Sequence, residues 1–233
     1  MRLLAKITTS LLLFSALCFG QRATFMQLNG QTASGGVTWT LVNSTFNPSC
    51  TVPATTCATT IPAATDGNLL IIDTFTTENV TIASTSGGGT STHCSNCSAF
   101  IPSSGATDIS YITSVTGGTT SVSVTLSLSE DAFFAVQITE WHRSTGTATF
   151  DVSGNAEPTG CTACTGTALS LTGSDDLIFH AINEQHSFVS ISSPYTVDVN
   201  DVYCYLLNAT TGTAPVLNQT PSGEAAFSSI AFK

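Results

Sequence analysis

The chain has 233 residues, of which 9% are charged, and its 15 acidic and 5 basic residues give a formal net charge of −10. A negatively charged surface repels phosphate backbones and anionic lipid headgroups, which argues against nucleic-acid and membrane-surface partners. Hydrophobic residues make up 42% of the chain, which is too many for a disordered stalk and, with so few charges, is typical of extracellular β proteins.

Residues 1–20 have the pattern of a secretory signal peptide. Arg2 and Lys6 form a basic start, an apolar run is centred on residues 11–14, and cleavage is expected after Gly20. The apolar run is about half as long as a membrane-spanning helix requires. Removing this segment takes away two basic and no acidic residues, so residues 21–233 carry 3 basic and 15 acidic residues and a net charge near −12. We therefore expect a secreted or cell-surface protein without membrane insertion after cleavage.

Residues 21–233 predict one β-sandwich domain, in which short strands alternate with turns. The first predicted strands are residues 23–28 and 36–42, and a proline-containing loop is expected from residue 43 to residue 64. Residues 66–77 begin with a turn signal and continue as a strongly apolar strand. The segments ISYITSV and SVSVTLSLS flank Gly117 and Gly118, which predicts a hairpin.

Residues 132–143, AFFAVQITEWHR, predict the central strand. Alternation places two sets of side chains on opposite faces: Phe134, Val136, Ile138 and Glu140 on one, and Phe133, Ala135, Gln137, Thr139 and Trp141 on the other. Neither face is plainly polar, so we expect this strand in the middle of a sandwich. Further short strands follow to the C-terminus, without helical periodicity and without a repeat at a solenoid or propeller period. The pattern predicts an all-β, antiparallel two-sheet sandwich.

Four phrases occur in the order DGNLLII, ITEW, DDLIFHAI and SIAFK. In this order they resemble exported bacterial Ser/Thr/Gly-rich β-sandwich domains, which are similar to concanavalin A-like jelly rolls. The resemblance covers roughly residues 43–233. It implies a jelly-roll fold and an extracellular or cell-surface role, and it supplies no catalytic residues.

Seven cysteines remain after residue 20, and disulfide bonds are the default in an exported chain. The simplest pairing joins sequence neighbours: Cys50 with Cys57, Cys94 with Cys97, and Cys161 with Cys164. Other connectivities stay open because the two C-x-x-C pairs can also bridge each other, and a zinc site with four cysteine ligands is a further alternative that oxidation disfavours. Cys204 is then left as a buried free thiol, on the face opposite Tyr203 and Tyr205.

Two arrangements raise the question of a metal ion. A predicted strand places His180, Glu184 and His186 on one face, but only Glu184 and His186 are close enough to share an ion. The turn DVNDV gathers possible calcium ligands without the spacing of an EF-hand loop: Asp198, Asn200 and Asp201. Strand-end and turn residues of purely structural role are the alternative in both places, and we expect no resident metal or cofactor.

No catalytic signature stands out. Jelly-roll glycosidases often carry paired carboxylates as E-x-D-x-x-E, which does not occur here, and no G-x-S-x-G elbow is present. Glu140 lies on a half-apolar face and could act as an acid, but a structural pairing with Arg143 is the alternative. The sequence therefore favours a binding protein over an enzyme.

The end of the central strand is the predicted ligand site: Glu140, Trp141, His142 and Arg143. Trp141 has polar neighbours on its face, so we expect its indole to be partly exposed and able to stack on a sugar. The predicted function is a binding or adhesion module, with a polysaccharide or cell-wall glycan as partner. Two alternatives are a structural subunit that self-assembles into a homo-oligomer through its β edges, and a polysaccharide-active enzyme.

Overall fold

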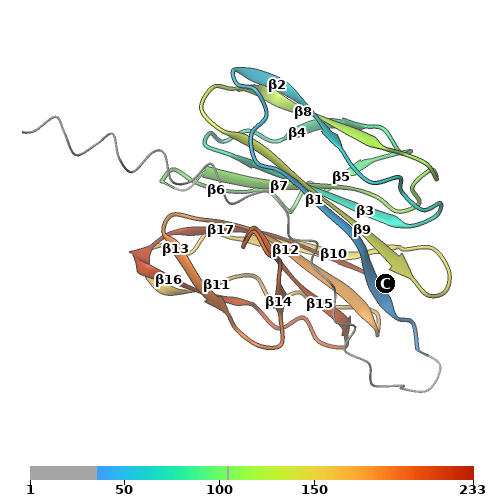
Figure 1. Cartoon of the computed structure of the whole chain (residues 1–233). Coiled ribbons are helices and arrows are strands. Elements are labelled where there is room, and N and C mark those ends of the chain that lie inside the picture. Colours follow the sequence, from blue (N-terminus) through green and yellow to red (C-terminus); the bar gives the residue numbers. More distant parts are fainter. Residues whose placement is uncertain (1–35, 104) are drawn as a thin grey trace, which may run out of the picture. The chain divides into compact units, whose positions relative to one another are not determined.

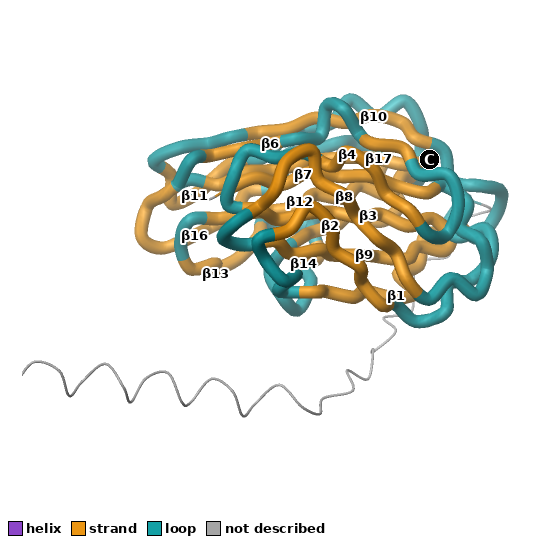
Figure 2. The backbone as a smooth tube through the Cα atoms, turned by 90° about the horizontal axis from the view of Figure 1, so that it is seen from above, coloured by secondary structure: helices purple, strands orange, loops and turns teal. Residues whose placement is uncertain are grey.

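The computed structural model of the protein describes residues 36–103 and 105–233, and Gly36–Lys233 forms one compact unit. These residues form 17 strands in antiparallel pairings, joined by loops and turns (Figures 1 and 2). The prediction of an all-β antiparallel fold is confirmed. The strand predicted at residues 23–28 lies outside the described residues. Within the described part of the chain there is no helix that is long and apolar enough to span a membrane.

The strands form four sheets, which we call sheets A to D. Sheet A has the spatial order β1 (Trp39–Asn47), β9 (Phe134–Arg143), β3 (Leu69–Thr76), β7 (Gly105–Ile112) and β5 (Thr92–His93), and β6 (Ala99–Ile101) also pairs with β7. Sheet B has the order β2 (Ala54–Thr60), β8 (Ser121–Glu130) and β4 (Ile82–Ser86). Sheet C has the order β10 (Phe150–Ala156), β17 (Ala225–Phe232), β12 (Asp176–Glu184), β15 (Tyr203–Ala209) and β14 (Thr196–Val197). Sheet D has the order β11 (Cys161–Thr165), β16 (Val216–Gly223) and β13 (Ser187–Ile191).

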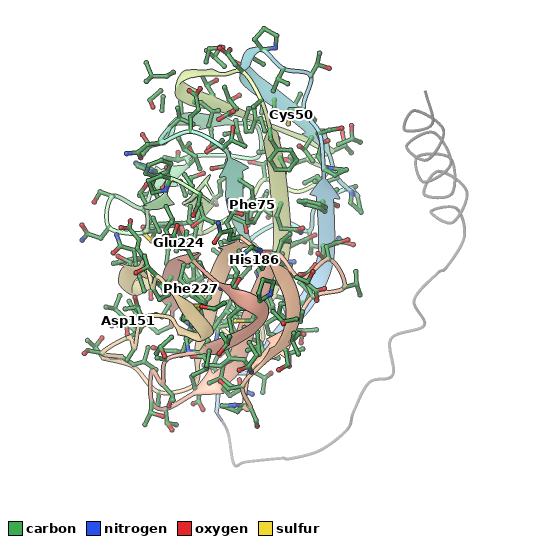
Figure 3. All side chains as sticks on the ribbon, turned by 90° about the vertical axis from the view of Figure 1, so that its left-hand side faces the viewer. Cys50, Phe75, Asp151, His186, Glu224 and Phe227 are labelled. Atoms are coloured by element: carbon green, nitrogen blue, oxygen red, sulfur yellow. A yellow bond between two sulfur atoms is a disulfide. The ribbon has the colours of Figure 1, made fainter. Side chains whose placement is uncertain are left out.

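Three hydrophobic cores lie between the four sheets, which stack as layers in the order B, A, C, D (Figure 1). The sequence predicted a sandwich of two sheets, and the structure has four. Sheets B and A enclose a core that contains Cys50, sheets A and C enclose one that contains Phe75, and sheets C and D enclose one that contains Phe227. Figure 3 labels these three residues, which mark the successive cores. Because sheets A and C are each covered on both faces, their strands contain few solvent-facing positions.

The strand order repeats within the chain. Strands β1–β5 correspond, one by one, to β10–β14, and strands β7–β9 correspond to β15–β17. With this correspondence, the spatial order of sheet A is that of sheet C, and the spatial order of sheet B is that of sheet D. Of the 17 strands, only β6 lacks a counterpart. The register repeats as well: Leu69 pairs with Trp141 as Leu177 pairs with Phe232, and Cys57 pairs with Val124 as Cys164 pairs with Leu217. We call residues 36–143 the first half and residues 150–233 the second half.

Three pairs of bulges occur at matching places in the two halves, while the register shift between Asp176 and Ile178 in the β12–β15 pair has no counterpart in the β3–β7 pair. The register shifts between Leu41 and Asn43 on β1 and between Phe150 and Val152 on β10. Similar pairs of shifts occur on β2 and β11 and on β4 and β13. Bulges are specific features of a strand pair, so their coincidence indicates two copies of one folding pattern that pack through sheets A and C.

Two predictions about local structure are wrong. The loop predicted for residues 43–64 contains the end of β1 and all of β2, because β2 buries only Cys57 and Thr59 and has no run of large apolar residues. The segments flanking Gly117 and Gly118 are not a hairpin, since β7 belongs to sheet A and β8 to sheet B. A turn between two stacked sheets has the same residue preferences as a turn between paired strands.

The prediction for β9 is confirmed. Residues Phe134 to Trp141 are all buried, with Phe134, Val136 and Ile138 in the core toward sheet B and Ala135 and Trp141 in the core toward sheet C. The strand lies between β1 and β3, inside the sheet.

The three local cysteine pairs are also confirmed, as disulfides Cys50–Cys57, Cys94–Cys97 and Cys161–Cys164. Cys204 is a free, buried thiol in the core between sheets C and D, and Tyr203 and Tyr205 face the opposite core as predicted.

Candidate functional site

The predicted ligand site at the end of β9 is divided between the two faces of sheet A. Trp141 is fully buried, its Nε1 donates to Thr139 Oγ1 at 2.8 Å, and its ring meets Tyr205 edge-on at 4.9 Å. The expectation of a partly exposed indole is therefore wrong, because sheet C covers this face of sheet A. A sugar cannot stack on Trp141 in this arrangement.

Glu140 and His142 belong to a hydrogen-bonded chain on the other face. The carboxylate of Glu140 accepts hydrogen bonds from Asn43 Nδ2 at 2.8 Å, Thr65 N at 2.8 Å and Asn68 Nδ2 at 2.6 Å. Asn68 Oδ1 lies 3.0 Å from Nδ1 of His142, whose side chain is exposed. Glu140 is therefore buried and fully paired, which fits a structural carboxylate, and His142 is the part of this group that reaches solvent.

Arg143 forms no hydrogen bond or ion pair with Glu140, the partner considered for it from the sequence. Its Nη1 donates to the carbonyl of Thr145, and its guanidinium lies 5.9 Å from the ring centre of Trp39. A cation over an indole face is a stabilising contact. Of the four predicted residues, only Glu140 and His142 share one hydrogen-bonded group.

The corresponding place in the second half holds a pair of carboxyl groups. Asp151 lies 3.0 Å from Lys233 Nζ and accepts Thr172 N at 2.7 Å, whereas neither oxygen of the buried Asp176 has a partner. Burial and the neighbouring Asp151 raise the pKa of Asp176 to about 6. Burial also opposes ionisation of Asp151, but its hydrogen bonds from Thr172 and Lys233 outweigh this and lower its pKa to about 2.

This carboxyl pair resembles a catalytic dyad only in that two neighbouring carboxyl groups have pKa values shifted in opposite directions. The side chain of Asp151, labelled in Figure 3, is 1% exposed and Asp176 is fully buried. A polysaccharide cannot reach either group, so the pair fits a structural contact that fixes the C-terminal end of β17.

The residues considered as metal ligands do not converge. His180 is buried, with Nδ1 2.7 Å from Ser229 Oγ and Nε2 3.2 Å from Tyr195 OH, and burial lowers its pKa to about 3. Both oxygens of Asp198 accept hydrogen bonds from its own turn, including Asn200 N and Val202 N at 2.9 Å. Within residues 36–103 and 105–233, no three Asp, Glu, His or Cys side chains are grouped so that they could hold a metal ion.

The outer face of sheet B is a different kind of surface, which the sequence analysis did not recognise. Register and exposure place eight residues on it, and we call them the hydroxyl face: Thr56, Ala58, Thr60, Ser84, Ser86, Ser121, Ser123 and Thr125. Seven of the eight carry a hydroxyl group and none is charged or aromatic. Neighbouring side chains on such a face are spaced by about 7 Å along a strand and about 5 Å between strands. The sequence signal was Ser or Thr at alternate positions on neighbouring strands.

The outer face of sheet D is the counterpart of the hydroxyl face in the second half. Its matching positions hold Ala163, Thr165, Ser190, Val216 and Asn218, together with Ser192, which follows β13 and lies opposite Val216. Three of these six carry hydroxyl groups, compared with seven of eight on the hydroxyl face, so the array of hydroxyl groups is denser in the first half.

The exposed aromatic side chains do not offer a stacking platform. Both tryptophans and all four tyrosines of the chain are buried. Phe133 and Phe150 are 40% and 41% exposed, and Phe150 already stacks on Tyr111 at 5.9 Å. Searches against protein-family models, curated proteins and solved structures find no match to this chain.

Proposed function

We propose that this protein is a secreted or cell-surface binding and adhesion module that contacts a polysaccharide or cell-wall glycan through its hydroxyl face. The observation that carries the proposal is the uncharged array of seven hydroxyl groups on one sheet, in a chain whose net charge is strongly negative. Ser and Thr hydroxyls both donate and accept hydrogen bonds, as sugar hydroxyls do. Because the array is held by paired strands, its groups are ordered before binding, which lowers the entropic cost of association.

Hydrogen bonding replaces the aromatic stacking that the sequence first suggested. No aromatic residue belongs to the hydroxyl face, and Trp141 is buried. A contact of this kind is weak for each group and depends on many groups engaging together, which suits an extended polymer better than a small sugar.

A self-assembling structural subunit is the second candidate. Its support is the position of the two outer faces, since sheets B and D end the stack of layers and neither outer face carries a charge at the matched positions. Contacts between such faces on successive copies would not close on themselves and would extend into a filament. The polysaccharide-active enzyme is not proposed, because the carboxyl groups that resemble an active site are buried.

Each half also supports the proposal of a jelly-roll fold. Successive strands alternate between the two sheets of a half, with β1 and β3 in sheet A and β2 and β4 in sheet B, and with β7, β8 and β9 again alternating. Such interleaving is a property of jelly rolls. The three disulfides fit an exported protein.

Sedimentation of the protein with insoluble polysaccharides such as cellulose, chitin and peptidoglycan tests the binding function. Thr125→Glu places a long charged side chain in the middle of the hydroxyl face, and Asn218→Glu makes the same change at the matching position of sheet D. We expect Thr125→Glu to lower the bound fraction at least about tenfold and Asn218→Glu to leave it unchanged. Wild-type protein that binds none of the polymers, or equal binding by both variants, would contradict the proposal. Filaments in electron microscopy that Thr125→Glu abolishes would favour the second candidate.

A further inference from the structure

The contact between sheets A and C, which we call the seam, contains a buried acidic group without a partner. Asp73 on β3 is fully buried and faces the seam, between Ile71 and Phe75 in the alternation of that strand. Neither of its carboxyl oxygens has a hydrogen-bond partner. Its register partner on β9 is Gln137, whose Oε1 is buried and unpartnered as well. Buried polar atoms without partners are rare and require an explanation.

The donors around these oxygens are already engaged. Nε2 of Gln137 donates to Ser44 Oγ at 3.0 Å and to the carbonyl of Ile138 at 3.3 Å, which occupies both of its hydrogens. The hydroxyl of Tyr203, from the second half, donates to Ser44 Oγ at 3.1 Å. The seam therefore contains three acceptor oxygens, two from Asp73 and one from Gln137, and no donor of the described residues lies within hydrogen-bond distance of any of them.

The charges nearby are negative. In the first half, β1 and β9 have no titratable side chain next to Asp73 on the face toward the seam. On β7, the residue paired with Asp73 is Ile109, and Tyr111 is paired with Ile71. On the second half, Tyr203 packs in the same core as Ile71 and Phe75, and the charge of Asp198 opposes ionisation of Asp73. The charges of Asp201 and Asp198 likewise oppose ionisation of Glu184. The carboxylate of Asp198 accepts four hydrogen bonds from its turn.

Within residues 36–103 and 105–233, no fixed cation is available to neutralise Asp73. The described residues contain two fixed cations, of which Arg143 bonds to the carbonyl of Thr145 and Lys233 bonds to Asp151. The described part of the chain also lacks a group of three metal-ligating side chains. An ionised Asp73 would therefore be a buried, unpaired charge beside another anion, which is among the costliest arrangements in a protein interior.

We propose that Asp73 is protonated at neutral pH and that its O–H donates to Oε1 of Gln137, so that one proton keeps the seam between the two halves free of a buried charge. This proton supplies the donor that the two unpartnered side chains lack, and it removes the repulsion from Asp198. Burial, and then the charge of Asp198, raise the pKa of Asp73 well above its ordinary value, in agreement with this assignment. Loss of the proton in alkaline solution places a carboxylate in the seam and weakens the contact between sheets A and C.

Carbon-13 NMR of protein labelled at the aspartate carboxyl groups tests the protonation state directly. The signal of Asp73, assigned through its own β protons, is expected at the position of a carboxylic acid at pH 7, in the wild-type protein. A carboxylate position at pH 7 would overturn the proposal. The proposal would also be overturned if the Asp73 signal moved when calcium was added, or when EDTA removed bound calcium, because a cation would then be the missing partner.

The pH dependence of the thermal midpoint provides a second test. Asp73→Asn keeps the shape and a hydrogen-bond donor but cannot ionise, and Asp66→Asn makes the same change at an exposed carboxylate that accepts Gly117 N at 3.0 Å. Since the folded state holds the proton of Asp73 more tightly, the wild type should lose stability relative to Asp73→Asn as pH rises above about 4, by about 3 °C per pH unit up to the pKa of Asp73. Asp66→Asn should follow the wild type. Parallel profiles for the wild type and Asp73→Asn would overturn the proposal.

Discussion

Replacing Trp141 by alanine should destabilise the protein strongly, because the indole is a core residue at the seam. It is fully buried, it contacts Tyr205 of the second half, and its Nε1 donates to Thr139. Truncating a buried Trp to Ala costs about 3–5 kcal/mol, from lost transfer free energy and from the cavity that remains. For a domain of this size, that loss corresponds to a decrease in the thermal midpoint of about 8–16 °C.

Trp141→Phe is the matched variant, since the second half holds Phe232 at the equivalent position of its inner sheet. We expect it to cost about 1–2 kcal/mol, because a ring still fills the site and the Thr139 hydroxyl loses its donor. Thr139→Val isolates the hydrogen bond and should cost about 1 kcal/mol. Urea unfolding of the three variants, followed by circular dichroism, measures each change in the free energy of unfolding.

The expected order of unfolding free energies is therefore wild type, then Thr139→Val and Trp141→Phe, then Trp141→Ala. A Trp141→Ala variant within about 1 kcal/mol of the wild type would refute the placement of Trp141 in the core. Acrylamide quenching of the native fluorescence gives an independent check, because buried indoles should be protected from the quencher. Strong quenching of wild-type emission would also refute it.

Three further predictions concern the buried carboxyl pair and the cysteines. The pKa of Asp176 is raised to about 6, so the folded protein loses stability as pH rises from 4 through 6. Asp176→Asn should therefore be more stable than the wild type at pH 8, by up to about 3 kcal/mol. At pH 4 it should not be more stable. Equal thermal midpoints of the two proteins at pH 8 would contradict this. Burial raises the pKa of the Cys204 thiol, so iodoacetamide should modify one thiol in urea and none in the native protein, as read by intact mass. Replacing Cys50 and Cys57 together, or Cys161 and Cys164 together, by serine should lower the unfolding free energy by about 2 kcal/mol each in calorimetry, and an unchanged stability would show that these loops are not closed by disulfides.

Features set by local pattern could be predicted from the sequence. A period of two residues was sufficient to predict that β9 alternates between two covered faces. The same period gave the side of β15 on which Cys204 lies. The three disulfides join cysteines separated by 3 or 7 residues, so pairing each cysteine with its neighbour in the sequence was sufficient to identify them. Strand β2 was missed because a Thr-rich strand that buries a disulfide and one threonine has little apolar signal.

Features set by distant parts of the chain could not be predicted. Trp141 was expected to be exposed because its neighbours on the strand are polar, but it is covered by Tyr205 from the second half. The apparent hairpin at Gly117 and Gly118 depended on which strands β7 and β8 pair with, and turn residues carry no such information. The repeat between the halves was hidden because equivalent residues differ, as Trp141 and Phe232 do, and because loops of unequal length shift their spacing.

The differences between the two halves explain why sheet A packs on sheet C and not on a second sheet A. Some apolar positions of the seam are identical in the two halves, as Leu69 and Leu177 are, and others differ, as Trp141 and Phe232 do. The equivalents of Asp73 and Gln137 are Ala181 and Ser228, which are small. Two copies of sheet A face to face would bring two buried Asp73 carboxyl groups without partners into one seam, whereas sheet C presents an alanine at that position. A buried polar group that is costly against the wrong partner and tolerated against the right one is a general means of fixing which surfaces associate.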